Sequence, residues 1–131
     1  MASATGSWAQ YELRGVWRPE DQVLQFLAFP DIKVVPEKRA AIYEVLGLIN
    51  EQLWLGHFEM WSGSGLVVFR HAAILDTGDS EGLSLEQAES IAEAAMEECE
   101  RFYPVFQFVL WGGKTPADAL ASALIETQGE A

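Results

Sequence analysis

Residues 84–113 read SLEQAESIAEAAMEECERFYPVFQFVLWGG, and this stretch decides the fold. Apolar side chains recur in it at steps of three and four, a spacing that places them on one face of an α-helix. The stripe consists of Ile91, Ala95, Cys99, Phe102, Phe106 and Leu110. Pro104 removes one backbone hydrogen bond from such a helix but leaves the stripe in register. We therefore predict one long helix, kinked at Pro104 and held by packing against the rest of the chain.

A first β-hairpin is predicted near the start of the chain. Residues 8–18 alternate between apolar and polar side chains, and residues 23–29 form a second apolar run. The Pro-Glu-Asp sequence at 19–21 is typical of a turn, so the two runs are expected to pair antiparallel.

A second hairpin is predicted at residues 57–61 and 66–75, on either side of the sequence Ser-Gly-Ser-Gly. Counting outward from the turn pairs Phe58 with Phe69 and His57 with Arg70. The strand 66–75 is apolar on both faces, which indicates an interior position in the sheet.

Two further helices complete the predicted order. One spans 36–54, because Pro36 suits the first helical position and apolar residues follow at helical spacing. The other is short and begins after Thr115 and Pro116, beyond the Gly-Gly that ends the long helix. These elements indicate an α+β fold, a four-stranded antiparallel sheet of two hairpins packed against helices.

The domain organisation follows from length and composition. Residues 1–7 are small and polar and are interpreted as a flexible leader, and residues 8–131 as a single domain. A four-stranded sheet with helices on one side leaves a face or an edge uncovered, and a second copy of the chain is the simplest partner for it. We therefore expect a homodimer.

Charge and cysteine content exclude several classes of partner and structure. The net charge of −12 argues against nucleic acid and against an anionic membrane surface. Cys99 is the only cysteine, so no internal disulfide is available, and a reducing compartment is indicated. The longest apolar runs fall far short of the roughly 20 residues that span a bilayer. We expect a cytoplasmic protein.

One sequence motif suggests catalysis. Asp76-Thr77-Gly78 follows two apolar residues, as in the signature of aspartic proteases. In those enzymes two such aspartates meet and share a proton. Here the motif is followed by acidic residues and a capped helix, and Asp-Thr-Gly is also an ordinary turn sequence. An aspartic-protease-like hydrolase is therefore kept as the alternative hypothesis.

The remaining reactive side chains do not form a predicted site. The proposed pairing turns His57 and His71 to opposite faces of the sheet, so they are not expected to share a metal. Cys99 lies on the apolar stripe beside two glutamates, which predicts a buried, unreactive thiol. A row of acids is expected along the outer face of the long helix: Glu86, Glu89, Glu93, Glu97 and Glu100. No cofactor, metal ion or catalytic residue is predicted.

Aromatic residues are the candidates for binding a partner. The chain has five tryptophans, and tryptophan is enriched among the residues that dominate protein interfaces. Trp54 and Trp61 flank the entry to the second hairpin, and Phe102 and Phe106 lie on the long helix. These four residues are the predicted partner-binding set. A further hypothesis for the function is a purely structural dimer, in which helices of two copies meet around Phe102 and Phe106.

Three segments resemble the YbjN family of bacterial proteins. They are LINEQLWLGHFEMW at 48–61, EECERFYPVFQFVLWGGK at 97–114, and the earlier stretch 8–36 with its Phe-Pro-Asp-Ile-Lys-Val. The resemblance covers nearly all of the chain from Trp8 onward.

The resemblance implies a sensory transduction regulator with a fold similar to type III secretion chaperones. Such a fold runs helix, three strands, helix, two strands, helix, and usually dimerises. On this comparison the chain lacks the first helix and the first strand. The family has no known catalytic residues. The favoured hypothesis is accordingly a non-catalytic module that binds a protein or peptide partner through an apolar surface or an open sheet edge.

Overall fold

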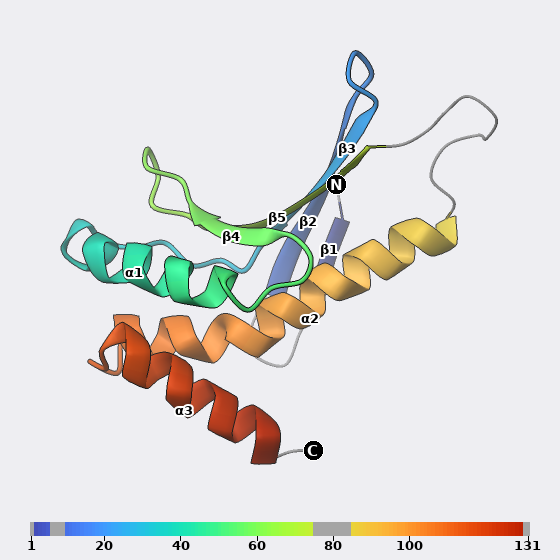
Figure 1. The fold of residues 1–131 in the computed structure, drawn as a ribbon. Helices are drawn as coiled ribbons and strands as arrows, with labels where there is room; N and C mark the ends of the chain where they lie inside the picture. The colour runs from blue at the N-terminus through green and yellow to red at the C-terminus, as the bar shows by residue number, and fades with distance from the viewer. Residues whose placement is uncertain (1, 6–9, 75–84, 130–131) are drawn as a thin grey trace.

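The computed structural model describes residues 2–5, 10–74 and 85–129 (Figure 1). Along the chain these residues form β1 (Ala2–Thr5), β2 (Gln10–Arg18), β3 (Val23–Phe29), a 3-10 turn (Pro36–Lys38), α1 (Arg39–Asn50), β4 (His57–Met60), β5 (Val67–Ile74), α2 (Leu85–Leu110) and α3 (Pro116–Gly129).

The strands form one antiparallel sheet in the order β1-β2-β3-β5-β4. The three helices lie on the same side of it, with α1 and α2 next to the sheet and α3 packed against both (Figure 1). The predicted α+β fold and both predicted hairpins are confirmed. A fifth strand extends the sheet: β1 pairs with the outer edge of β2 and places Ala2 opposite Leu13, where the sequence predicted a flexible leader.

The predicted register of the second hairpin is confirmed. Phe58 pairs with Phe69 and His57 with Arg70, and β5 lies between β3 and β4 as an interior strand. The connecting loop is closed by the N–H of Gly65, which donates to the carbonyl of Trp61 at 2.6 Å. Local turn geometry thus sets which side chains of β4 and β5 share a face.

The helices follow the prediction with one difference in length. The long helix is confirmed, because α2 continues through Pro104 to Leu110. Its end is followed by Gly113 at φ 69°, and α3 begins after Thr115, whose hydroxyl accepts a hydrogen bond from the N–H of Asp118 at 3.3 Å. The first helix is shorter than predicted: α1 ends at Asn50 and not near residue 54.

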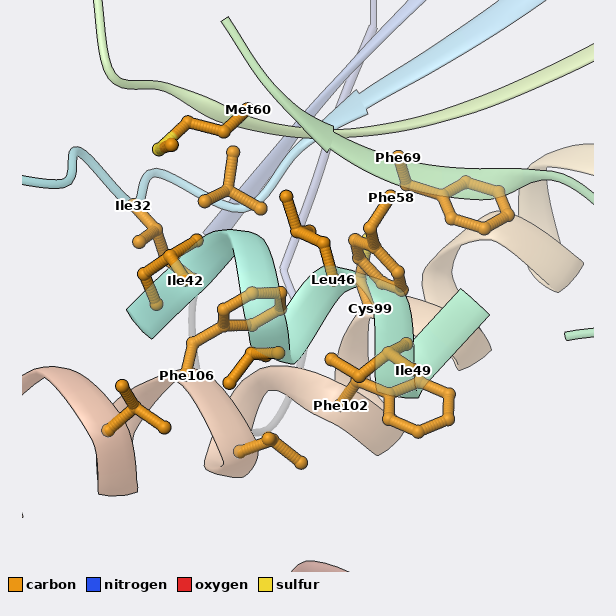
Figure 2. Close-up of a cluster of buried hydrophobic side chains, with 14 of the residues drawn as sticks. Ile32, Ile42, Leu46, Ile49, Phe58, Met60, Phe69, Cys99, Phe102 and Phe106 are labelled. Carbon is orange, nitrogen blue, oxygen red and sulfur yellow. The ribbon is translucent and has the colours of Figure 1, made fainter. Parts of the chain in front are cut away.

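The main core lies between the helices and the inner face of the sheet (Figure 2). Phe58 is at its centre, with ring centroids 5.2 Å from Phe69, 6.0 Å from Phe102 and 5.6 Å from Phe106. All three pairs have edge-to-face geometry, which is favourable for aromatic rings. From Ala95 to Phe106 the stripe on α2 is therefore covered by the chain's own sheet and by α1.

The outer face of the sheet carries a smaller apolar cluster. Leu27, Phe29 and Val68 are buried there beneath Trp61 and Leu66. Phe29 and Trp61 meet edge-to-face with centroids 5.5 Å apart. No helix among the described residues covers this face (Figure 1).

Candidate functional site

Trp54 lies in the segment that joins α1 to β4, and its side chain is 98% exposed. The neighbouring Leu55 is 54% exposed. The segment then turns at Gly56, which has φ 68° and so adopts a conformation that favours glycine. A Cβ at Gly56 would lie 2.6 Å from the Phe69 ring, so only glycine lets the backbone pass this close to β5. The turn holds two large apolar side chains in solvent.

An apolar groove of about 320 Å³ lies beside these two side chains, between their segment, β5 and α2. Phe69 of β5 and Ile91 of α2 contribute to its apolar walls. Where α2 borders the groove it carries the small residue Ala94, so the helix does not fill the space next to the sheet. Concave, mainly apolar sites of this kind are the usual places where proteins bind ligands and peptides.

Charged side chains line the same groove. Glu97, Glu98 and Arg101 come from α2, and His71 comes from β5. One carboxylate oxygen of Glu98, Oε2, is buried and has no hydrogen-bond partner among the described residues. Burial raises the pKa of Glu98 above its ordinary value; Glu97 raises it further, and Arg101 opposes both effects. The groove therefore combines apolar walls with a poorly solvated carboxyl group.

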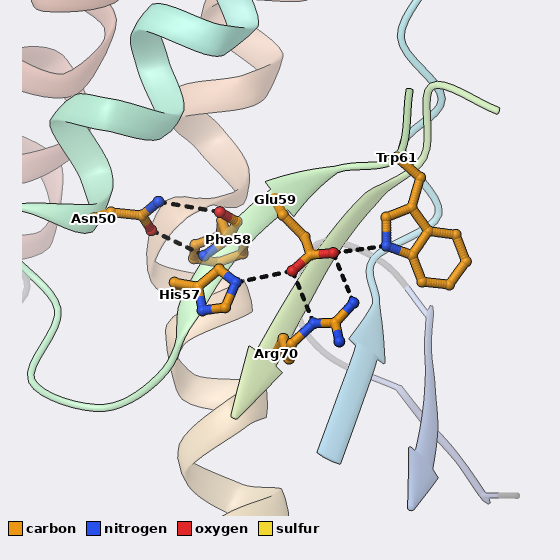
Figure 3. A network of polar contacts seen from close by, with 6 residues as sticks. All are labelled: Asn50, His57, Phe58, Glu59, Trp61 and Arg70. Atoms are coloured by element: carbon orange, nitrogen blue, oxygen red, sulfur yellow. Dashed lines mark hydrogen bonds and ion pairs between the residues drawn. The ribbon is translucent and has the colours of Figure 1, made fainter. Parts of the chain in front are cut away.

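Trp61, the second predicted tryptophan, lies on the other face of the sheet and is half-buried (Figure 3). Its indole N–H donates to Glu59 at 2.8 Å, and Arg70 and His57 also contact this carboxylate at 2.8 Å. Burial alone would raise the pKa of Glu59, but the hydrogen bonds from Arg70, His57 and Trp61 lower it below its ordinary value. The network fixes the Trp61 ring in place, away from the groove.

Phe102 and Phe106 are not available to a partner in this fold. Each is 1% exposed, and both rings pack against Phe58 in the core (Figure 2). Their prediction as partner-binding residues, and the hypothesis that two copies meet around them, are corrected. The part of the apolar stripe that contains the two phenylalanines is covered inside one chain.

The predicted acidic row on α2 is correct for four of its five members. Glu86, Glu89, Glu93 and Glu97 are exposed. Glu100 is the exception, because both of its carboxylate oxygens are buried. It lies near Tyr11, a fully buried residue of β2; burial and the charge of Glu100 raise the pKa of Tyr11 above its ordinary value.

The other reactive side chains are dispersed. His57 and His71 lie on opposite faces of the sheet, as the register predicts. Cys99 is buried, and burial raises the pKa of its thiol to about 12, with a further contribution from Glu98. Within residues 2–5, 10–74 and 85–129, no cluster of three potential metal ligands occurs. Asp76-Thr77-Gly78 lies outside the described residues.

Asn50 closes the sheet edge that β4 forms (Figure 3). Its side-chain amide donates to the carbonyl of Phe58 at 3.0 Å and accepts from the N–H of Phe58 at 2.9 Å. The amide thus takes the place that the backbone of an added strand would occupy. An open edge was one of the two predicted binding surfaces, and at Phe58 this edge is closed.

We expect Asn50→Ala to lower the free energy of unfolding by about 1–3 kcal/mol, because the part-buried Phe58 backbone loses both hydrogen bonds. Urea denaturation of the two purified proteins measures the difference. Asn50→Asp is the matched control. It keeps an acceptor for the Phe58 N–H, so its free energy of unfolding should lie between those of the parent and Asn50→Ala. A variant with alanine that is as stable as the parent would contradict the role of this amide.

Sequence reasoning assigned no binding role to Leu55, His71, Glu98 or Asn50. His71 belongs to a strand that the sequence predicted correctly and Leu55 lies in the segment between α1 and β4, but their neighbours across the groove are distant in the chain. Glu98 precedes Cys99 of the apolar stripe, and this position beside the stripe was the available signal that its carboxyl group is partly buried.

A comparison with known protein families decides the family. The family model YbjN, described as "Putative bacterial sensory transduction regulator", matches residues 2–108. The chain belongs to the YbjN family. No curated protein matches the chain, and no solved structure does.

The YbjN match runs from β1 through most of α2, so it includes the segment that carries Trp54 and the whole groove. The matched region has three strands, a helix, two strands and a helix in succession. The resemblance led us to expect that the family's first strand was lacking; β1 supplies a third strand before α1 and corrects that expectation. The likeness to type III secretion chaperones stays an expectation.

The YbjN description names a regulator and no enzymatic reaction. Within the part of the chain that the structure describes, none of the helices combines the length and the apolar character needed to cross a lipid bilayer.

Proposed function

We propose that this YbjN-family chain is a non-catalytic protein-interaction module that acts in regulation by binding a peptide segment of a partner protein in the groove beside Trp54. The observation that carries the proposal is the 98% exposure of Trp54 directly at the rim of an apolar groove. A tryptophan that contributes nothing to the core is positioned to contribute its apolar area to a complex.

The energetics favour binding at this place. Burying Trp54 and Leu55 under a partner removes two large apolar surfaces from water at once. Tryptophan is enriched among interface residues whose truncation costs about 2 kcal/mol or more. The turn at Gly56 brings the backbone of the segment against β5, so less backbone freedom is lost on binding.

The mode of binding takes account of β4, whose edge is closed at Phe58. Because the Asn50 amide occupies the Phe58 backbone, a partner strand does not find free donors and acceptors there. Recognition is therefore assigned to side chains that enter the groove. The partner is a segment with apolar side chains, as in peptides that dock through a few anchors in a groove.

Trp61 has a different place in this proposal. Its ring covers the apolar cluster on the outer sheet face and is tied to Glu59. We assign to Trp61 the role of stabilising the outer face of the sheet. The homodimer expected from the sequence would form on this face. The homodimer and the cytoplasmic location stay predictions.

Selection from a phage-displayed library of random peptides on the immobilised protein tests the proposed function. We expect enriched peptides whose affinity, measured by fluorescence anisotropy, falls about tenfold or more in Trp54→Ala. Trp54 makes little contact with the rest of the chain, so this variant should unfold at the same urea concentration as the parent.

Trp111→Ala is the matched control, because Trp111 is also exposed (67%) but lies beyond the end of α2 and does not line the groove. It should bind the enriched peptides as the parent does. The proposal fails when no peptide is enriched above an unrelated acidic protein, or when the peptides bind parent and Trp54→Ala equally well.

A further inference from the structure

We propose that the groove selects segments that place a lysine or arginine beside an apolar side chain, with the cation paired to Glu98. This inference rests on the proposed function and names the chemistry of the partner. The partner is a basic, amphipathic peptide segment.

The first argument is the unsatisfied carboxylate. Glu98 lines the groove, and its buried Oε2 has no hydrogen-bond partner among the described residues. A carboxylate with one oxygen out of reach of water is costly to ionise, and an ammonium or guanidinium group beside the exposed part of Glu98 supplies a donor together with the opposite charge. Burial already raises the pKa of Glu98, which is the effect expected of a carboxyl group that lacks such a partner.

The second argument is that no cation among the described residues forms an ion pair with Glu98, although the charge of Arg101 acts on it from a distance. Arg101 lines the groove, but its guanidinium lies over the Phe102 ring, 4.8 Å from the centroid. The ion pairs between described residues include none with Glu98. His71 on β5 and Glu97 on α2 are the other titratable groups that line the groove, and the segment with Trp54 contributes none.

The third argument is charge complementarity over a longer range. The exposed acids Glu86, Glu89, Glu93 and Glu97 lie on the same helix as Glu98, and the whole chain has a net charge of −12. The negative electrostatic potential of these acids attracts a basic segment of a partner and repels an acidic one as the two proteins approach each other. The apolar walls then accept the neighbouring apolar side chain, and Glu98 fixes the position of the cation.

A pair of small probes tests the inference without knowledge of the partner. Phenylbutylammonium chloride carries a ring and a cation, and phenylbutanol carries the same ring and chain with a neutral hydroxyl. Binding of each is followed by chemical-shift changes of backbone amides in the ¹⁵N-labelled protein. We expect the ammonium to bind the parent about tenfold more tightly than the alcohol, with shifts centred on the groove residues.

Two variants identify the residue responsible. Glu98→Gln should bind both probes as weakly as the parent binds the alcohol, whereas Glu93→Gln, on the same helix but outside the groove, should keep the preference for the ammonium. Equal binding of the two probes by the parent, or a preference that survives in Glu98→Gln, would overturn the inference. A probe preference without any Trp54-dependent peptide would instead count against the proposed function alone.

Discussion

Phe58→Ala is expected to lower the free energy of unfolding by about 3–5 kcal/mol, the largest effect of any substitution considered for this chain. Phe58 is 2% exposed, and its ring meets those of Phe69, Phe102 and Phe106 edge-to-face. Truncation removes contacts with β5 and α2 at once and leaves a cavity between layers that cannot close without moving the sheet relative to the helix.

Urea denaturation followed by far-UV circular dichroism measures the effect of Phe58→Ala. Tyr43→Ala is the control: Tyr43 is a large aromatic residue on α1 but is 53% exposed, and its loss should change stability by no more than about 0.5 kcal/mol. Comparable stabilities for the two variants would mean that the aromatic cluster is not the centre of the core.

Gly65→Ala is expected to lower the free energy of unfolding by about 2–4 kcal/mol, from left-handed backbone strain and overpacking together. Gly65 has φ 77°, and a Cβ there would lie 2.6 Å from the carbonyl oxygen of Val34. The neighbouring chain cannot retreat freely, because the N–H of Val34 donates to the carbonyl of Gly65 at 2.8 Å. The substitution therefore separates the β4–β5 loop from the segment that leads into α1.

Gly63→Ala is the matched control for this prediction. Gly63 lies in the same loop, and a Cβ there would meet no atom within 4 Å. The same chemical change should leave the midpoint of urea denaturation almost unaltered. If both glycines tolerated alanine equally, the close packing of the loop against Val34 would be refuted.

The hairpins were predictable because their signals are local. In the second hairpin, the Ser-Gly-Ser-Gly turn and the apolar runs on either side set the pairing of Phe58 with Phe69, and the structure confirms it. A register depends on the loop and on the alternation of side chains, and both are written in adjacent residues.

The two differences in secondary structure have causes outside the local sequence. β1 consists of small and polar residues with little strand preference, and it is a strand because β2 offers it an edge. The apolar spacing predicted that the first helix would reach residue 54, but it ends at Asn50, whose side chain is engaged with the Phe58 backbone. Neither the pairing of β1 with β2 nor the contact of Asn50 with Phe58 can be recognised from the local sequence of β1 or α1.

The candidate site was predictable only in part. Trp54 was singled out from its residue type and position, and the structure shows it exposed at a groove. Phe102 was singled out on the same grounds and is buried. Periodicity shows that a helical face will be covered, but it does not show whether the cover comes from the same chain or from another.

By itself, the sequence determined the α+β class, the pairing of both hairpins, the register of the second hairpin, the length of α2 and the acidic character of its exposed side. These properties depend on turn residues, on periodicity and on charge, all of which act between neighbours in the chain. Only the tertiary structure decided that Trp54 faces solvent, that Oε2 of Glu98 has no hydrogen-bond partner among the described residues and that Asn50 closes the β4 edge at Phe58. Each of these properties depends on which residues, distant in the sequence, lie next to one another in the folded chain. Only the packing of the elements in three dimensions determines those neighbours.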